Sequence, residues 1–452
     1  MQLNLKNTSK KMSILFFAYL FIIYFIGYLE FKKTKNVTHY TISSKNASWY
    51  LVGGSIIASC IGGSATIGVI SLSYEVGFPA IWWLLSGASG LLVLCIFLAK
   101  KIAISKALTM PEMIEYYIGK KARFIASIII VLAWSSILAA QLLASAWILA
   151  AILKIPFNFA VFVSAFIIIT YSILAGQASI LKSDLAQSML MFITFFIIIL
   201  WFIFVKDVSI TNLNFEFLND KFTISRWSYF MLIIGGSYIV CPMLFGRVLS
   251  AKSKFDAKFG VAFGVIGIII GAIMVVLIGL ISQNFINPTV INDQILTKDI
   301  CETLPPFLGA ILLVVLFSAI ISSADSCLIT ASSVFCNDIL KTKSLKIYRV
   351  FTILFGLFAL LLTFGKKNIL GYLLGANDIY VSGVVLVVFM AMISKKKLNE
   401  SICLLAMIIG GGIGLVGAMS DEKIYSFIAL FLAFIISILA HFKGQKVEAG
   451  NQ

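Results

Sequence analysis

Runs of about 20 consecutive apolar residues recur along the whole chain, and they constrain its fold more than any other feature. Each run is long enough to cross a hydrocarbon core of about 30 Å as a helix. Inside a bilayer every backbone N–H and C=O group must be paired within the protein, and a helix does this by itself. We therefore expect an all-α integral membrane protein.

The apolar runs predict about thirteen transmembrane helices. Of the 452 residues, 61% are hydrophobic and 12% are charged, whereas a soluble domain has about 45–50% apolar residues. The predicted spans lie near residues 12–30, 48–74, 79–99, 122–152, 157–174, 183–205, 227–247, 256–282, 305–333, 345–364, 368–391, 398–419 and 423–441. No loop between them is long enough for a soluble domain, so we expect one membrane domain and no enzymatic function.

The loop charges predict the orientation, because Lys and Arg concentrate on the cytoplasmic side of a membrane protein. Most of the 35 Lys and Arg residues fall in cytoplasmic loops if the N-terminus is periplasmic and the C-terminus cytoplasmic. We expect a multi-pass protein of the bacterial cytoplasmic (inner) membrane, by default a monomer. The net charge of +16 is scattered among short loops, which does not indicate a nucleic-acid partner.

The second and seventh spans share residues that weaken a helix. The second contains Gly53-Gly54 and Gly62-Gly63, and the seventh contains Gly235-Gly236 and Pro242. Interrupted helices at corresponding positions of two halves indicate a transporter with its binding site near the bilayer midplane. Because the two spans lie five apart, equivalent helices run in opposite directions, as in an inverted repeat. Glycines that only allow close helix packing are the alternative.

This pattern divides the chain into four parts. We expect a periplasmic N-terminus, a peripheral first helix and a cytoplasmic loop over 1–47. The first repeat, with core helices one to five, covers 48–205. The second repeat, with its preceding periplasmic loop, covers 206–391. Two peripheral helices and a cytoplasmic tail form 392–452.

The ninth span carries a polar stripe in an otherwise apolar helix. At 100° per residue one face collects Ala319, Ser322, Ser323, Ser326, Thr330 and Ser333. Oxygen atoms are the ligands that hard cations prefer, so the stripe predicts one wall of a sodium site. Carbonyls freed where the second span unwinds, within residues 58–63, would supply the other wall. The alternative is that each serine bonds a carbonyl one turn earlier.

Three segments carry a resemblance to a known family. The stretch FSAIISSADSCLITASSVFCNDI, residues 317–339, resembles the eighth core helix of the sodium:solute symporter family. The segment from Cys241 to Lys252 resembles the family's Pro-x-x-x-x-Arg segment, most closely in its sodium/proline branch. Residues 109–113, Thr-Met-Pro-Glu-Met, resemble its Leu-Pro-Glu-Phe loop. Together these motifs span most of the predicted core.

The resemblance implies a LeuT-like 5+5 inverted repeat with one extra helix at the N-terminus and two at the C-terminus. It also implies a sodium site formed by the carbonyls of Ala58, Ile61 and Ala319 and by the hydroxyls of Ser322 and Ser323. Sodium would be the coupling ion, and the lipid bilayer and a small-molecule solute would be the remaining partners.

Some relatives have a second ion site, so one or two sodium ions remain open. Residues 183–187, Ser-Asp-Leu-Ala-Gln, resemble the family's Thr-Asp-Val-x-Gln, which would bring Asp184 to this site with Ser323 and Ser326. Asp325 stands where two-ion relatives have serine, and its role is not fixed. A carboxylate that stabilises a helix N-terminus is the alternative for Asp184.

The solute should bind where the interrupted helices cross. The candidates are Gly62, Gly63, Ser64, Ala65, Thr66, Gln141, Tyr238 and Asn377, together with Trp134. Trp134 and Tyr238 could equally be core aromatics, and Gln141 could serve helix packing. No Arg or Lys is expected deep in the core, so exposed backbone amides at a half-helix N-terminus would hold an anionic group. This favours an amino acid or a small carboxylate.

We therefore expect sodium-coupled symport by alternating access. Proton coupling through Asp325, Asp184 or Asp378 is the alternative within transport. A membrane sensor or a channel is a third class, disfavoured because the chain has no signalling domain and no four-fold pore motif.

Overall fold

The computed structural model describes residues 2–209, 213–285, 300–301, 303–365, 369–394, 396–420 and 422–446. Within them, twelve helices are long and apolar enough to cross a membrane, and a bent pair of shorter helices makes a thirteenth candidate span. The prediction of a helical membrane protein with about thirteen spans is confirmed.

The first six predicted spans form helices α1 to α9. Their bounds are α1 (Gln2–Lys33), α2 (Val37–Ile42), η1 (Ser43–Lys45), α3 (Trp49–Cys60), η2 (Ser64–Gly68), α4 (Val69–Val76), η3 (Phe78–Ile81), α5 (Trp82–Val93), η4 (Leu94–Leu98), α6 (Ala99–Ile104), α7 (Met110–Tyr117), α8 (Lys120–Leu153) and α9 (Phe157–Phe204). Helix α9 contains two spans, which meet at Gly176. The φ of 63° at Gly176 breaks the helical path there. The sixth span therefore begins several residues before residue 183, where its start was predicted.

The remaining elements complete the bundle. They are α10 (Ile224–Tyr229), η6 (Phe230–Gly235), α11 (Gly236–Ile239), α12 (Pro242–Leu249), α13 (Lys254–Ser282), α15 (Pro306–Val334), η7 (Phe335–Ile339), α16 (Leu345–Leu362), α17 (Ile369–Tyr380), η8 (Val381–Val385), α18 (Leu386–Ile393), β1 (Lys396–Lys397), α19 (Glu400–Ser420), α20 (Lys423–Phe442) and β2 (Gln445–Lys446). The two short strands pair antiparallel.

The second span is broken at Ile61–Gly63. Helix α3 ends at Cys60, and the chain resumes at Ser64 with its axis turned by 60°. Gly53 and Gly54, by contrast, lie inside the continuous helix α3. A Cβ at Gly53 would lie 2.6 Å from Phe263, so this glycine serves close packing against α13. Only the second glycine pair marks the interruption.

The seventh span is also interrupted, between α11 and α12. Val240 and Cys241 leave the helical conformation, and Pro242 begins the next helix. Proline suits this first position because its missing N–H would have no partner there. The two breaks lie five spans apart, as the inverted repeat predicts.

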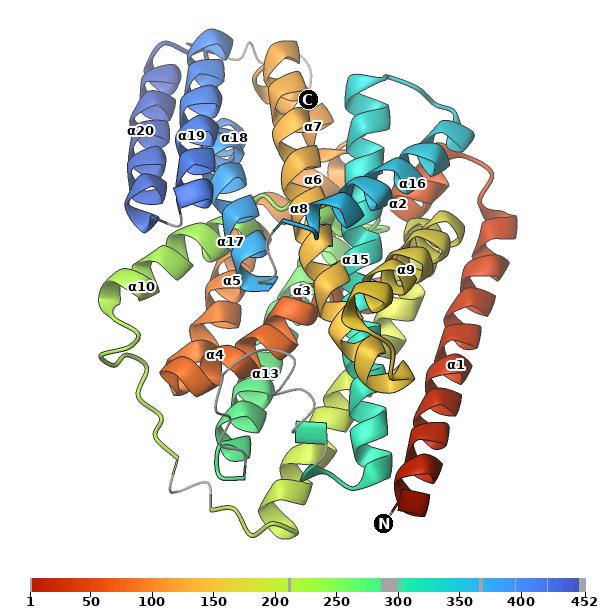
Figure 1. Ribbon diagram of the computed structural model, residues 1–452. Helices are drawn as coiled ribbons and strands as arrows, with labels where there is room; N and C mark the ends of the chain where they lie inside the picture. The colour runs from red at the N-terminus through yellow and green to blue at the C-terminus, as the bar shows by residue number, and fades with distance from the viewer. Residues whose placement is uncertain are drawn as a thin grey trace.

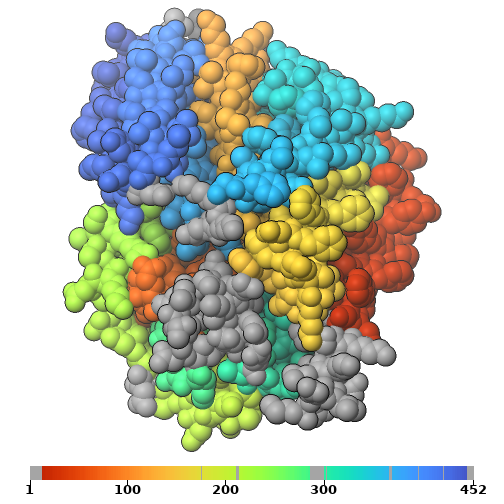
Figure 2. All heavy atoms as spheres, in the orientation of Figure 1, coloured from red at the N-terminus to blue at the C-terminus, as the bar shows by residue number. Residues whose placement is uncertain are grey.

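The extra helices lie at the edges of the bundle. Figure 1 shows α1 along one side and α19 and α20 on the opposite side, and the space-filling view shows the same two flanks (Figure 2). Large apolar side chains on these helices are exposed, such as Phe21 at 72% and Phe431 at 63%. Such surfaces suit contact with lipid. In Figure 1 the chain begins at the bottom and its last described residues lie near the top, consistent with an odd number of crossings.

Glycine allows close approach of α5 to η6. A Cβ added to Gly90 would lie 1.8 Å from the Gly235 carbonyl oxygen, so the backbones must separate to accept any side chain. We expect Gly90→Ala to lower the free energy of unfolding by about 1–3 kcal/mol through overpacking. Gly412→Ala is the matched control, because no atom lies within 4 Å of a Cβ there. Thermal unfolding of both purified variants in detergent measures the effect, and equal unfolding temperatures would contradict the packing argument.

Candidate ion and solute site

The break in α3 contacts the polar stripe of α15 through a single serine. The Ser323 hydroxyl donates to the Ser59 carbonyl oxygen at 2.9 Å and to the Ala319 carbonyl oxygen at 3.3 Å. A Cβ at Gly62 would lie 2.1 Å from the Ser323 Oγ. Position 62 must therefore be glycine for α15 to approach the break this closely.

The unwound segment leaves carbonyl oxygens without donors. Ile61 has φ −100° and ψ 58°, which ends α3. In the described part of the chain no hydrogen bond reaches the carbonyl oxygens of Ala58 and Ile61. Ala58 and Ile61 flank Ser59, whose carbonyl accepts from Ser323, and Ala319 lies one turn before Ser323 on α15. Four of the five predicted sodium ligands thus belong to the residues at or next to this contact.

The fifth predicted ligand, Ser322, uses its hydroxyl hydrogen in a bond to a different helix. The Ser322 hydroxyl donates to Asp184 Oδ1 at 2.6 Å, and the Ser55 hydroxyl donates to Asp184 Oδ2. Asp184 lies in the second half of α9 and is fully buried. It therefore joins α3, α9 and α15 below the break, toward the first residues of α3.

Arg247 lies at the centre of this buried network, which corrects the expectation that no Arg or Lys is deep in the core. Its side chain is 1% exposed. Its guanidinium donates to the hydroxyls of Ser55, Ser59 and Ser326 and to the Met243 carbonyl oxygen, and it lies 3.5 Å from Asp184 Oδ2. Arg247 is the last residue of the span predicted over 227–247, at the cytoplasmic end of that span in the predicted orientation. It is buried because the helix restarts at Pro242, which sets Arg247 on the inner face of α12.

Asp325 is buried at the edge of this network, to which Ser326 joins it. Its Oδ1 accepts a hydrogen bond from Ser326 at 3.2 Å. Its Oδ2 has no hydrogen-bond partner among the described residues.

The predicted solute residues divide into two groups. Gln141 of α8 reaches the break, where its Oε1 accepts from the Gly63 amide at 3.1 Å, and the Thr66 hydroxyl donates to the Gly62 carbonyl oxygen at 2.8 Å. Ser64 and Ala65 are buried in η2. Tyr238 packs against Gly87 of α5 and also contacts Cys60 at the end of α3. Asn377, by contrast, is buried on α17.

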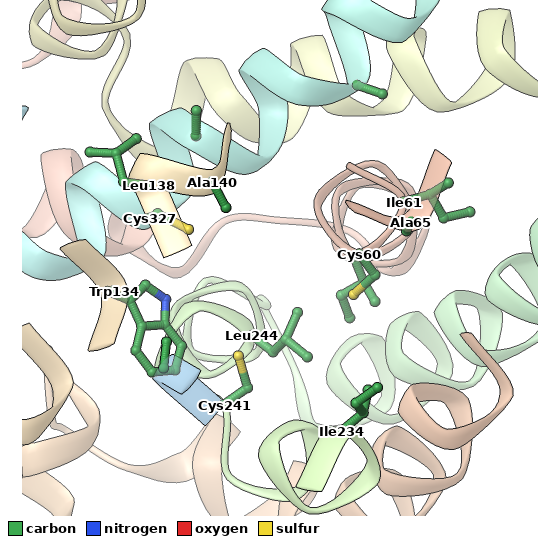
Figure 3. Close-up of a cluster of buried hydrophobic side chains, with 14 of the residues drawn as sticks. Cys60, Ile61, Ala65, Trp134, Leu138, Ala140, Ile234, Cys241, Leu244 and Cys327 are labelled. Atoms are coloured by element: carbon green, nitrogen blue, oxygen red, sulfur yellow. The ribbon is translucent and has the colours of Figure 1, made fainter. Parts of the chain in front are cut away.

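An apolar cluster lies around the two breaks, and of its labelled members only Ile61, Ala65 and Trp134 were among the predicted site residues. Figure 3 shows that its side chains come from the ends of α3 and α12 and from α8 and α15; among them are Cys60, Trp134, Leu138, Cys241 and Cys327. Trp134 packs edge-on against Tyr380 with ring centroids 4.9 Å apart. The Tyr380 hydroxyl donates to the Val240 carbonyl oxygen. Tyr380 thereby provides a donor for the Val240 carbonyl, which lies where the seventh span leaves the helical conformation.

A pocket continues the polar stripe of α15 beyond the ion residues. Thr330 and Ser333 line it, together with Thr109, Gln177 and Met243. The pocket lies next to the backbone oxygen that holds Arg247. The stripe therefore leads from the break in α3 to this pocket.

An ionic cluster closes the end of the bundle near the pocket. Arg123 of α8 pairs with Glu115 of α7 at 2.6 Å and with Asp338 of η7 at 2.7 Å, and the Thr109 hydroxyl donates to Asp338 at 2.9 Å. The hydrogen bond from Arg123 holds the pKa of Glu115 below its usual value. No group of three or more His, Cys, Asp or Glu side chains in the described ranges is arranged to hold a metal ion. An ion at the junction would be held mainly by neutral oxygens.

Comparison with known proteins places this geometry in a family. The profile of the sodium:solute symporter family matches residues 40–410. The chain is 24% identical to a sodium/glucose cotransporter of Vibrio parahaemolyticus, over 68% of this chain and 64% of that protein. It is 21% identical to a sodium/pantothenate symporter of Haemophilus influenzae, over 96% and 95% of the two chains. It is 23% identical to a sodium/proline symporter of Staphylococcus aureus, over 74% and 69%. The first match thus spans less than two thirds of that relative.

A solved structure shows the same fold. A Na⁺-coupled sialic acid symporter in a substrate-bound outward-open state superposes with a TM-score of 0.78 and 16% identity, over 96% of this chain and 99% of that chain. The fold is therefore LeuT-like, and the predicted fold class is confirmed.

Loss of the ionic cluster should open the pocket. Arg123→Gln removes two ion pairs that tie α7 and η7 to α8, each charged hydrogen bond being worth about 1.5–3 kcal/mol. We expect Ser333→Cys, whose position is buried in the pocket lining, to react several-fold faster with N-ethylmaleimide when Arg123→Gln is added. Mass spectrometry of the labelled peptide measures the rate. Lys101→Gln is the control, since among the described residues Lys101 bonds the Met392 carbonyl and no member of the ionic cluster. Equal rates in all backgrounds would show that the cluster does not close the pocket.

Proposed function

The chain belongs to the sodium:solute symporter family, and from this we propose that it carries a small organic solute into the cell together with sodium by alternating access. The observation that supports this most is the Ser323 contact across the break in α3. An ion bound at this contact joins the two elements that must move apart. Its binding therefore stabilises one conformation over another, which is what coupling requires.

The proposed sodium ligands are the carbonyl oxygens of Ala58, Ile61 and Ala319 and the hydroxyls of Ser322 and Ser323. The unpaired carbonyls of Ala58 and Ile61 support this set, because buried carbonyls usually have a partner. The Ser323 hydroxyl already reaches from α15 to the backbone of α3. Sodium would replace this hydrogen bond as the bridge.

The proposed direction of transport follows from the loop charges. With the N-terminus outside, the pocket lined by Thr330 and Ser333 and the cluster around Arg123 lie on the cytoplasmic side. Sodium then enters from the periplasm and leaves along the polar stripe of α15. Each inward-moving charge gains about 2.3 kcal/mol per 100 mV, inside negative. The four-part division at residues 47, 205 and 391 is part of this proposal.

The proposed solute is a small carboxylate or amino acid with an apolar body. The Gly62 amide forms no hydrogen bond in the described part of the chain, and the Gly63 amide is capped only by Gln141. A carboxylate could displace the Gln141 oxygen from this helix start. The apolar cluster around Cys60 and Cys241 would contact the rest of the solute. The indole N–H of Trp134, which has no partner among the described residues, offers one further donor.

Proton coupling is the second candidate. It is favoured by the unpaired Oδ2 of Asp325. Asp378 is less suited to this role, because Tyr229 and Ser426 already donate to its carboxylate.

Ser323→Ala tests the sodium site. Loss of one ligand and of the contact with Ser59 should raise the sodium concentration for half-maximal uptake about tenfold, equivalent to about 1.4 kcal/mol. Ser332→Ala is the matched control, a buried serine on the same helix that bonds Ile329 and Thr352 instead. Initial uptake rates in proteoliposomes over a sodium series provide the measurement. Unchanged sodium activation in Ser323→Ala would refute the assignment.

A solute screen tests the coupling itself. We expect proteoliposomes to accumulate at least one radiolabelled amino acid or small carboxylate against its gradient, and replacement of external sodium by choline to abolish this. Collapse of the pH gradient at constant sodium should leave the initial rate unchanged. Uptake that persists without sodium and stops with the pH gradient would instead select proton coupling.

A further inference from the structure

The pocket lined by Thr330 and Ser333 contains two buried polar atoms without partners. Gln177 Nε2 and Ser333 Oγ form no hydrogen bond among the described residues, and both residues line the pocket. Gln177 is 4% exposed and Ser333 is 5% exposed. Leaving a buried polar group without a partner costs free energy. Two such groups around one cavity therefore indicate that a ligand binds between them.

A break in α9 brings Gln177 to this pocket. Gly176 has φ 63° and ψ 169°, a backbone conformation that glycine alone adopts readily. The chain changes direction there, and the next residue, Gln177, lines the pocket. Thr330 and Ser333 line it from α15. Polar groups of two helices thus converge on one cavity.

The pocket is large enough for one small ligand. Its volume is about 30 Å³, whereas about 10–15 Å³ is enough to hold one water molecule. A sodium ion without its hydration shell is no larger than a water molecule. An amino acid or a carboxylate solute does not fit. The ligand is therefore a water molecule or a small ion.

The other hydroxyls in the lining favour a cation over an anion. The Thr41 hydroxyl donates to the Val37 carbonyl oxygen at 2.8 Å, and the Thr109 hydroxyl donates to Asp338 at 2.9 Å. Because their hydrogens are used, both oxygens can offer only lone pairs to a ligand. Gln177 can do the same, since a half-turn of its amide group exchanges nitrogen and oxygen. Such oxygens are the ligands that hard cations prefer.

The charges around the pocket also favour a cation. No residue that lines it is charged. The buried network on one side has two carboxyl groups and one guanidinium, those of Asp184, Asp325 and Arg247. The other side has three carboxyl groups and one guanidinium, those of Glu112, Glu115, Asp338 and Arg123. Lys120 and Lys341 near Glu115 are exposed, so water and salt screen their charges. Because acidic groups outnumber buried basic ones on both sides, the local field attracts cations.

The pocket is separate from the Ser323 junction. Ser333 follows Ser323 by ten residues of α15, which is roughly 15 Å of helix. Between them, the Ser326 hydroxyl already serves Arg247 and the Ser322 carbonyl. An ion that leaves the junction along the stripe therefore finds the next buried serine hydroxyl without a partner at Ser333.

We propose that this pocket is a transient sodium site on the exit path, where Thr330, Ser333 and Gln177 hold the ion after it leaves the Ser323 junction and before it reaches the cytoplasm. The proposal rests on the proposed function, because the junction supplies the ion and the loop charges set the direction. Opening of the Arg123 cluster then lets the ion leave the pocket.

Sodium protection of a thiol tests the proposal without knowledge of the solute. Val334 lines the pocket, is 1% exposed and is not a proposed ligand. The purified full-length Val334→Cys protein in detergent is treated with N-ethylmaleimide in sodium chloride or in choline chloride, and mass spectrometry of the labelled peptide gives the rate. We expect sodium to slow the reaction about fivefold, because only the fraction of protein with an empty pocket can react.

Further substitutions in Val334→Cys locate the protecting ion. Gln177→Leu and Ser333→Ala each remove one oxygen, and neither Gln177 Nε2 nor Ser333 Oγ has a hydrogen bond to lose. We expect each to raise the sodium concentration for half-maximal protection about tenfold. Protection should persist when Ser323→Ala is added. Ser332→Ala is the matched control, because its hydroxyl bonds Ile329 and Thr352, and it should leave the protection unchanged.

Internal sodium provides a second test once the screen has found a transported solute. In right-side-out membrane vesicles, sodium loaded inside should occupy the pocket from the cytoplasmic side and slow uptake. We expect Gln177→Leu to raise the internal sodium concentration for half-maximal inhibition about tenfold, while the external concentration for half-maximal uptake stays within about twofold. Ser323→Ala should raise the external value instead.

The outcomes separate this proposal from the proposed function. Equal labelling in sodium and in choline would show that the pocket holds water and no sodium, and would overturn the proposal. Protection that is unchanged in both Gln177→Leu and Ser333→Ala would overturn it as well. Its loss in Ser323→Ala would then place the ion at the junction alone and leave sodium coupling intact. Uptake that needs no sodium would overturn the proposed function and, with it, the role of the pocket in transport.

Discussion

The close contact between Gly62 and Ser323 is the constraint from which the rest of this structure follows. Glycine at position 62 lets α15 lie against the unwound backbone and pair one of its carbonyls. Any side chain at this position would collide with the Ser323 hydroxyl. The neighbouring carbonyls of Ala58 and Ile61 stay unpaired in the described part of the chain, and these are the oxygens proposed to bind sodium. Gly62 and Gly63 lie where the second span turns its axis by 60°. The turn divides this span into two half-helices whose ends meet at the break. The proposed ion and solute positions both depend on this turn.

A second buried feature balances the first. The junction offers mainly neutral oxygens, whereas the network below it contains the Asp184–Arg247 pair. Separating these two roles has a physical advantage. A mobile ion held by neutral groups can leave without exposing a buried charge, because the charge of Asp184 is already balanced by Arg247 in the network below. In an isolated pair the desolvation cost would be severe, but here hydroxyls from α3 and α15 supply the missing hydrogen bonds.

Much of the fold could be predicted from the sequence because the membrane permits few alternatives. Apolar run lengths fixed the spans to within several residues, and Gly62-Gly63 and Pro242 marked the two breaks. The burial of Arg247 was not predicted, because this residue ends the span predicted over 227–247, where a charged side chain is expected to face the membrane surface. Its burial depends on serines from other helices, each unremarkable by itself. One signal was present: Ser55 and Ser59 are one turn apart on the second span, a short polar stripe that faces Arg247. Tyr380 gave no such signal, since its partner is a carbonyl exposed only in three dimensions.

The polar stripe of α15 shows why the ion and the gate belong to one mechanism. Its upper residues meet the break in α3, its middle residue Ser326 holds Arg247, and its lower residues line the pocket that the Arg123 cluster closes. All lie on one continuous helix, α15 with η7, so a shift of this helix against α3 is transmitted to the cluster. In the proposed mechanism, sodium at the junction would resist that shift by binding α3 and α15 together. The ion would then control the Arg123 cluster without touching it, through the position of the helix that reaches both.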